Sequence, residues 1–174
     1  MRKQFRDLVE PSEVQDLIDS LDISTETETV PLRGARGRIL AERVDADLDV
    51  PGFDRSNVDG YAVRATDTTG AGEVNPVTLG VAGVVEAGEE PALAVDQGRA
   101  VEIATGAVLP AGADAVVMIE DTSEDGDTVA IRTAVPPGGN VMAAGADIAA
   151  GDHALSAGVR LSPRTVGLLA ALGR

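Results

Sequence analysis

The chain has 174 residues, of which 44% are apolar and only 2% aromatic, so we expect a core of Val, Leu, Ile and Ala. Acidic residues outnumber basic ones by 29 to 14, and the net charge of −15 argues against a nucleic-acid partner, which would need a basic surface. The absence of cysteine excludes disulfides, Cys-ligated zinc, iron–sulfur clusters and a thiol nucleophile.

The cellular setting is also constrained by the sequence. Lys3 is the only lysine, and such an acidic, lysine-poor composition is typical of a high-salt cytoplasm, where the Debye length at 1 M is about 3 Å. The alternative is an ordinary acidic protein from a GC-rich genome. No apolar run reaches the roughly 18 residues that span a bilayer, and the N-terminal MRKQFRDLVE lacks a signal-peptide core. We therefore expect a cytoplasmic protein without a membrane partner.

The N-terminal quarter predicts one helix and one strand. Ser12 and Gln15 indicate a capping box, and apolar residues follow at helical spacing, so we expect an amphipathic helix over 12–21. Residues 23–29 are expected to form a loop, and 32–41 at best short, broken helical turns. The alternation of 44–50 predicts a half-buried strand with an acidic outer face. The apolar positions are Val14, Leu17, Ile18 and Leu21 in the helix, and Val44, Ala46, Leu48 and Val50 in the strand.

From Pro51 onward, short apolar runs closed by turn residues predict a compact β unit. A helix is expected over 163–172, with Ser162 as N-cap and Gly173 as C-cap signal. The single His153 argues against a His-rich metal site, and we identify no Ser–His–Asp set. The expected strands are 61–64, 77–86, 100–104, 115–119 and 129–135, and the apolar face of the last helix comprises Val166, Leu169, Ala170 and Leu172.

Two segments carry more specific information. In the first, PGFDRSNVDGYAVR at 51–64, Asp59-Gly60 predicts a tight turn in which Gly60 supplies a positive φ. Asp59 could simply bond its own backbone in that turn. The alternative is a ligand site, because this loop gathers polar oxygens and loops are where binding sites concentrate. These oxygens belong to Asp54, Ser56, Asn57 and Asp59.

The second segment is IATGAVLPAGADAVVMIE at 103–120. A strand is expected to end at Thr105-Gly106, where the glycine would let a ligand or another backbone come close. Thr105 could offer its hydroxyl to a ligand, or it could merely cap a turn.

These segments resemble the N-terminal half of the molybdopterin molybdenumtransferase family, the group of MoeA and the gephyrin E-domain. Residues 51–64 resemble its P-x-F-D-x-S-x-M-D-G-Y-A-V-R signature with Val58 in place of Met, and 103–120 its I-x-T-G-A-x-x-P-x-G-x-D-A-V-V-x-x-E signature. Residues 30–42 and the tail 145–173 also follow the family pattern. Four matches in order are more specific than any single short motif.

The resemblance implies an α+β, β-rich fold that the pattern alone does not supply. An elongated helical dimerisation domain would comprise residues 1–48 plus 146–174. A compact β-rich domain, residues 49–145, would be inserted between these two segments. The implied partner is a second copy of the chain, in a homodimer.

The resemblance also implies an activity, the insertion of molybdate into adenylylated molybdopterin with release of AMP. It implies Asp59 and Thr105 as catalytic residues, with Asp59 orienting hydrated Mg²⁺ or a water and Thr105 donating to molybdate or a phosphate. No metal ligand is assigned within the chain, and neither Mg²⁺ nor molybdate is expected to bind it tightly alone. The implied substrate-binding residues are Ser56, Asn57, Gly60, Gly106 and Ala107.

Two departures from the family pattern affect these expectations. Asn140-Val-Met-Ala-Ala144 stands where the family is often rich in arginine, and Ala146 replaces the usual Glu of G-E-D-I. The chain also stops where a molybdopterin-binding domain would begin, so we expect an incomplete enzyme: a fragment, a truncated product or half of a split protein. The alternatives are a non-catalytic dimeric scaffold or protein-interaction module of the same family, and a generic acidic β-rich domain.

Overall fold

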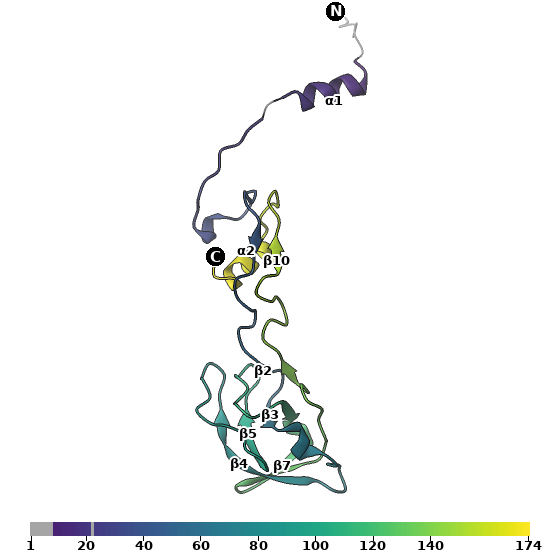
Figure 1. Ribbon diagram of the computed structural model, residues 1–174, viewed down its shortest axis with the longest axis vertical. Coiled ribbons are helices and arrows are strands. Elements are labelled where there is room, and N and C mark those ends of the chain that lie inside the picture. Colours follow the sequence, from purple (N-terminus) through teal and green to yellow (C-terminus); the bar gives the residue numbers. More distant parts are fainter. Residues whose placement is uncertain (1–8, 22) are drawn as a thin grey trace, which may run out of the picture.

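The computed structural model describes residues 9–21 and 23–174. Figure 1 shows an elongated molecule with a β-rich lobe at one end and a smaller lobe near its middle. We call these the sheet lobe, residues 51–142, and the helical lobe, residues 30–45 together with 153–174. Helix α1 (Pro11–Asp19) stands apart from both lobes at the end of an extended segment.

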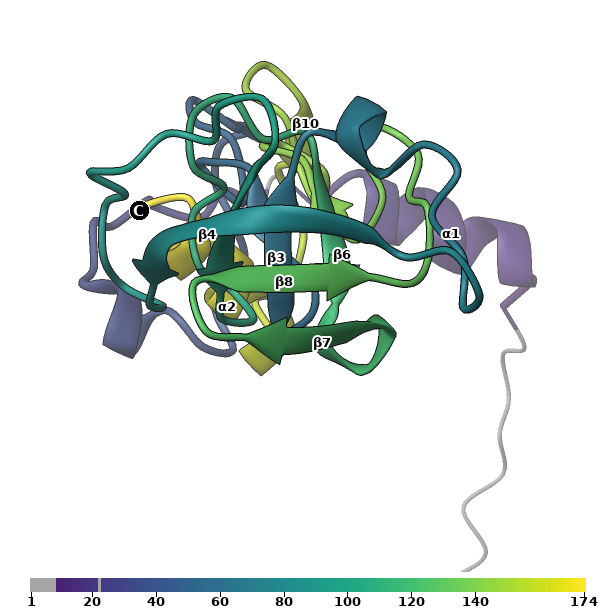
Figure 2. The same ribbon diagram turned by 90° about the horizontal axis from the view of Figure 1, so that it is seen from below.

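The sheet lobe is built on a six-stranded sheet in the order β6-β3-β5-β4-β8-β7. All neighbouring strands are antiparallel except β4 and β5, which run parallel. Figure 2 shows β4, β8 and β7 side by side across this lobe. The strands are β3 (Gly60–Val63), β4 (Val77–Val85), β5 (Arg99–Ile103), β6 (Ala115–Met118), β7 (Thr122–Asp125) and β8 (Thr128–Ile131).

The strand predictions are confirmed to within one residue for β3, β4, β5 and β6. The strand expected over 129–135 is shorter, because the chain leaves the sheet after Ile131 and the Val135 N–H donates to the Thr68 hydroxyl instead. Strand β7 was not predicted, since its sequence Thr-Ser-Glu-Asp has no apolar alternation. Two 3-10 helices, η2 (Ala65–Thr68) and η3 (Ile119–Asp121), fill connections in this lobe.

The sheet is covered on both faces at the interior strand β3, which therefore carries apolar residues without alternation. All four residues of β3 are buried. Tyr61 and Val63 belong to one apolar cluster, together with Leu79, Val117, Val129 and Ile131. Ala62 points to the other, which contains Val85, Val101, Ile103 and Val116. The core is therefore built almost entirely of Val, Ile, Leu and Ala, as the composition predicts.

Two antiparallel segments, residues 46–50 and 143–152, connect the lobes, and strand pairs lie at both ends of this connection. Strand β2 (Arg55–Ser56) pairs with β9 (Val141–Met142), and β1 (Val44–Asp45) pairs with β10 (His153–Leu155). The strand predicted over 44–50 is reduced to two residues, with a register shift between Val44 and Asp45, and Val50 pairs again only as an isolated bridge with Ile148. Ala46 is buried as expected, whereas Leu48 on the same predicted face is exposed.

The helical lobe has its own apolar cluster. The 3-10 helix η1 (Leu32–Gly34) lies in the segment expected to form broken helical turns, and helix α2 (Pro163–Ala171) packs nearby. Ser162 is the N-cap of α2 as predicted, in a capping box with Thr165. The separate cluster fits the predicted division into 1–48 plus 146–174 and 49–145, which stays a prediction. The buried members of the apolar cluster in the helical lobe are Ala35, Leu155, Leu161 and Leu169.

The two helices differ in how they bury their apolar faces. Leu169 and Leu172 are 5% and 2% exposed, so the face of α2 that carries them packs within the subunit. Helix α1 has no buried residue. The helix ends at Asp19, two residues before the predicted end. The apolar side chains of the predicted face, three in the helix and Leu21 just beyond it, are 44–63% exposed: Val14, Leu17, Ile18 and Leu21. Neither helix in the described part of the chain has the length and apolarity needed to cross a bilayer.

The capping box predicted at Ser12 is wrong. Helix α1 begins one residue earlier, at Pro11, with Glu10 at the N-cap position and no side-chain cap. Proline at the first helical position fixes a helical φ without losing a hydrogen bond, so it sets the start of this helix. Gln15 is left to bond Asp19 one turn on, at 3.0 Å.

We predict that Gly60→Ala destabilises the sheet lobe severely. A Cβ at position 60 would lie 1.9 Å from the Val117 carbonyl oxygen, which is backbone and cannot rotate away. We expect a loss of about 3 kcal/mol in the free energy of unfolding, measured by chemical denaturation. Gly72→Ala is the matched control, because its Cβ would meet nothing within 4 Å and should change stability by less than about 0.5 kcal/mol. Equal stability of the two variants would contradict the close approach.

Candidate functional site

Asp59 and Thr105 meet although they are 46 residues apart in sequence. Asp59 Oδ1 accepts hydrogen bonds from the Thr105 backbone N–H and from the Thr105 hydroxyl, each at 2.7 Å. These two side chains, implied as catalytic residues by the resemblance, therefore converge, and both are exposed to solvent. The turn in which Asp59 bonds its own backbone does not form, because the carboxylate reaches across to the second loop.

The sheet brings these two loops together. Asp59 directly precedes β3, and Thr105 follows the end of β5 by two residues. These strands are antiparallel with Gly60 opposite Ile103, so the start of one lies at the end of the other. The loops are further joined where the Gly106 N–H donates to the Ser56 carbonyl at 2.8 Å.

The two predicted glycines have different physical roles from those expected. Gly60 has no positive φ, so the turn argument was wrong for it. It is required instead by the backbone of β6, whose Val117 carbonyl occupies the place of a Cβ. Gly106 has φ +82° and no neighbour within 4 Å of a Cβ position, so glycine is required there by the left-handed backbone and not by an atom in the place of a Cβ.

The remaining predicted substrate-binding residues have mixed surroundings. Asn57 is exposed beside the pair. Ser56 is 1% exposed, and its hydroxyl donates to the Val58 carbonyl at 2.5 Å and accepts from the Val58 N–H at 3.2 Å. Ala107 is fully buried in the core. These contacts show Ser56 and Ala107 shaping the two loops, and the substrate contacts of all three stay predictions.

The charge state of Asp59 is fixed by its partner. The Thr105 backbone N–H, and then the Thr105 hydroxyl, hold the pKa of the Asp59 carboxyl below its ordinary value, because both stabilise the ionised form. Asp59 is therefore a carboxylate at neutral pH. Among residues 9–21 and 23–174, no three His, Asp or Glu side chains gather where they could hold a metal ion.

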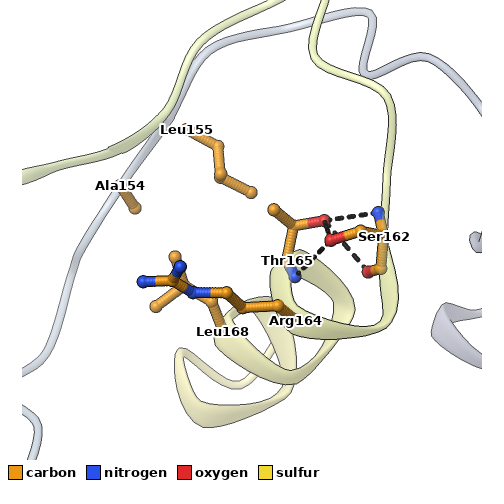
Figure 3. Close-up of a pocket in the computed structure, with 6 residues that line it drawn as sticks. All are labelled: Ala154, Leu155, Ser162, Arg164, Thr165 and Leu168. Carbon is orange, nitrogen blue, oxygen red and sulfur yellow. Dashed lines mark hydrogen bonds between the residues drawn. The ribbon is translucent and has the colours of Figure 1, made fainter.

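Two pockets in the protein surface lie away from Asp59 and Thr105. Figure 3 shows a pocket between β10 and α2, in which the side chains of Ser162 and Thr165 are bonded to each other and to backbone in the capping box. An open groove is lined by residues of the segment 25–45 and by Leu161, Leu169 and Arg174. Neither contains Asp59 or Thr105, which are exposed at a rim of the sheet lobe.

The structure also aligns a Ser–His–Asp set that sequence reading did not identify. His153 Nδ1 lies 3.2 Å from Asp45 Oδ1, and His153 Nε2 lies 2.8 Å from the Ser156 hydroxyl. Arg43 Nε binds the same Asp45 oxygen at 2.7 Å. A serine nucleophile also needs an enclosed site with oxyanion donors, and all three side chains are exposed, so we assign no activity to this set.

We predict that Thr105→Val raises the pKa of the Asp59 carboxyl only part of the way to its ordinary value of about 3.9. The substitution removes the hydroxyl donor and keeps the backbone N–H, which is the larger of the two causes. The measurement is an NMR titration of the Asp59 carboxyl carbon. An unchanged midpoint would show that the hydroxyl contributes nothing.

Asp59→Asn gives the corresponding prediction for stability. Because the folded-state pKa lies below the unfolded one, the carboxylate contributes stability above the unfolded pKa and loses it as pH falls through the folded pKa. The fall in melting temperature between about pH 4 and pH 2 should therefore be shallower in Asp59→Asn than in the unaltered chain. Identical slopes would count against the ionised pair.

Comparison with known proteins gives a consistent result. The family model described as "MoeA N-terminal region (domain I and II)" matches residues 9–173. The chain is 46% identical over 145 residues to molybdopterin molybdenumtransferase 2 of Mycobacterium tuberculosis, covering 83% of this chain and 36% of that protein. It is 40% identical over 156 residues to the molybdopterin molybdenumtransferase of a Nostoc species, covering 90% of this chain and 36% of that protein.

Solved structures agree. The molybdopterin biosynthesis moeA protein of Pyrococcus horikoshii OT3 superposes with a TM-score of 0.89 at 41% identity, covering 93% of this chain and 43% of that one. The chain thus spans about a third of the length of the curated relatives it matches.

Proposed function

This chain belongs to the family described as MoeA N-terminal region (domain I and II), and on that premise we propose that it is the N-terminal region of a molybdenum insertase. The resemblance carried by the sequence motifs and the α+β, β-rich fold class are both confirmed. The proposed reaction joins molybdate to adenylylated molybdopterin and releases AMP. The observation that supports it best is the Asp59–Thr105 pair, in which two family signature segments meet on an exposed rim.

The hydrogen bonds of the pair suggest different roles for Asp59 and Thr105. Asp59 is ionised, and both of its hydrogen bonds fall on Oδ1, with no bond to Oδ2 among the described residues. We propose that Oδ2 orients a water or takes a proton, as a positioned carboxylate does in general base catalysis.

Thr105 has one hydroxyl proton, and it is already donated to Asp59. An arriving oxyanion therefore has to displace Asp59 from that proton before Thr105 can donate to molybdate or a phosphate. We propose that this exchange couples oxyanion binding to release of the Asp59 carboxylate.

Two further elements of the proposal concern ions. The chain lacks arginine at 141–144, and Arg55 on the neighbouring strand donates to the Met142 sulfur at 3.2 Å, so we propose that most cations for the anionic substrate come from the rest of the enzyme. No three His, Asp or Glu side chains gather among the described residues where they could hold Mg²⁺. Magnesium in proteins commonly takes oxygen ligands from substrate phosphates, so its role is proposed only for the assembled enzyme.

We predict that Asp59→Asn and Thr105→Val each lower molybdenum insertion by about 10²-fold, the range that general acid–base groups contribute. The assay uses a complete family enzyme whose N-terminal region is replaced by this chain. Asp96→Asn is the matched control, because Asp96 is an exposed acid of the same lobe that forms only a backbone hydrogen bond. Full activity in both site variants would reject the catalytic role of the pair. An inactive chimera with the unaltered chain would reject the insertase proposal and favour a non-catalytic scaffold of the same family.

We also propose that the chain forms a homodimer through helix α1. Val14, Leu17, Ile18 and Leu21 are all at least 44% exposed, and burying such side chains against a second copy would stabilise the assembly. The high-salt habitat and the cytoplasmic location remain proposals supported by the composition. Molar salt would screen the repulsion between two chains of net charge −15.

The dimer proposal predicts a concentration-dependent dimer mass by light scattering in molar KCl, which Leu17→Asp reduces to a monomer mass. The buried charge would oppose association, whereas Asp16→Asn on the same helix should leave the dimer intact. A monomer mass for the unaltered chain at every salt concentration would rule out this assembly.

A further inference from the structure

Asn140 has an unusual backbone conformation. It is the one non-glycine residue with a positive φ, 57°, among the residues that the structure describes. Side chains make this left-handed region unfavourable, although asparagine tolerates it better than most residues. Such a conformation persists where surrounding contacts hold it. The question is which contacts require it here.

Asn140 links two segments that carry the candidate site. Its carbonyl accepts from the Asn57 N–H at 2.9 Å, two residues before Asp59. Its side-chain amide donates to the Val116 carbonyl on β6, also at 2.9 Å. The preceding residue extends the same contact, since the Gly139 carbonyl accepts from the Val116 N–H at 3.0 Å.

The contacts of Asn140 with Asn57 and Val116 lie on either side of the residues that position Asp59. On one side, the loop of Asn57 leads directly into Asp59 and Gly60. On the other side, Val116 is followed by Val117, whose carbonyl packs against Gly60, and the Ile119 N–H donates to the Asp59 carbonyl at 3.0 Å. A residue that holds the loop and β6 at the same time therefore sets the distance between the Asp59 backbone and the sheet.

We infer that Asn140 is a positioning residue, which fixes the Asp59 loop against β6 so that the Asp59 carboxylate stays within reach of Thr105. The functional meaning of this inference rests on the proposed function, since it concerns the same pair. Asparagine suits the position because it combines tolerance of a positive φ with a side-chain donor. Glycine keeps only the first property, and aspartate keeps the shape but has no N–H to give to Val116.

The test is the amide hydrogen exchange of Thr105 in Asn140→Asp and Asn140→Gly. Thr105 is an exposed residue whose N–H donates to Asp59 Oδ1, so the exchange rate of this amide reports that bond and not activity. We expect exchange at Thr105 to be about tenfold faster in both variants, the scale of losing one donor to a buried carbonyl, together with a changed Thr105 amide chemical shift.

Thr68→Val is the matched control. The buried Thr68 hydroxyl donates to the Ala65 carbonyl and accepts from the Val135 N–H, so this variant also loses hydrogen bonds within the sheet lobe. It should lower the melting temperature without altering the Thr105 amide shift, because its contacts lie outside the Asp59 loop and the Thr105 loop.

The outcomes separate the alternatives. Changes at Thr105 no larger than those in Thr68→Val would overturn the inference and leave Asn140 as an ordinary turn residue. Loss of folding in both Asn140 variants would overturn it as well, because the residue would then serve the fold as a whole. If Thr105 responds as expected while Asp59→Asn leaves molybdenum insertion unchanged, the positioning role stands and the proposed catalytic role of the pair fails.

Discussion

The close approach of β3 to β6 is the constraint on which the arrangement of the sheet lobe depends. At Gly60 the Val117 carbonyl occupies the space that any side chain would need. This contact lets β3 lie between β5 and β6 with both faces buried. It also places the start of β3 beside the end of β5, where Asp59 and Thr105 meet. The same glycine therefore serves the core and the candidate site, and one substitution there would disturb both.

The Asp59–Thr105 pair is held in a state that favours charge on the acid and leaves the hydroxyl without a free proton. In isolation this is a satisfied hydrogen-bonded pair on the surface. It becomes a reactive arrangement only if another group competes for the threonine proton. An anionic substrate next to a chain of net charge −15 would also need cations that this region supplies sparingly. Both features are consistent with a site that is completed by other parts of a larger enzyme.

The connection between the lobes uses carboxylates in a structural role. Asp54 Oδ1 accepts from the Ala144 N–H, and Asp49 Oδ1 accepts from the Ala150 N–H, each at 2.8 Å. These bonds join the segment that enters the sheet lobe to the segment that leaves it, in the connection between the lobes, where there is too little apolar surface to pack. The acidic residues of this chain are therefore not all solvated surface charge, because some replace the missing core between the lobes.

The sequence by itself determined the positions of the main strands, the start of α2 at Ser162 and the family, because apolar spacing, capping residues and signature strings are local. It also indicated Asp59 and Thr105 as site residues through the resemblance. Only the tertiary structure decided that these side chains bond each other, since that contact depends on which strands pair. It likewise assigned Gly60 to close packing rather than to a turn, and aligned Asp45, His153 and Ser156 on a ribbon. Strand pairing joins residues far apart in the chain, and no local pattern records which distant partner each strand will meet.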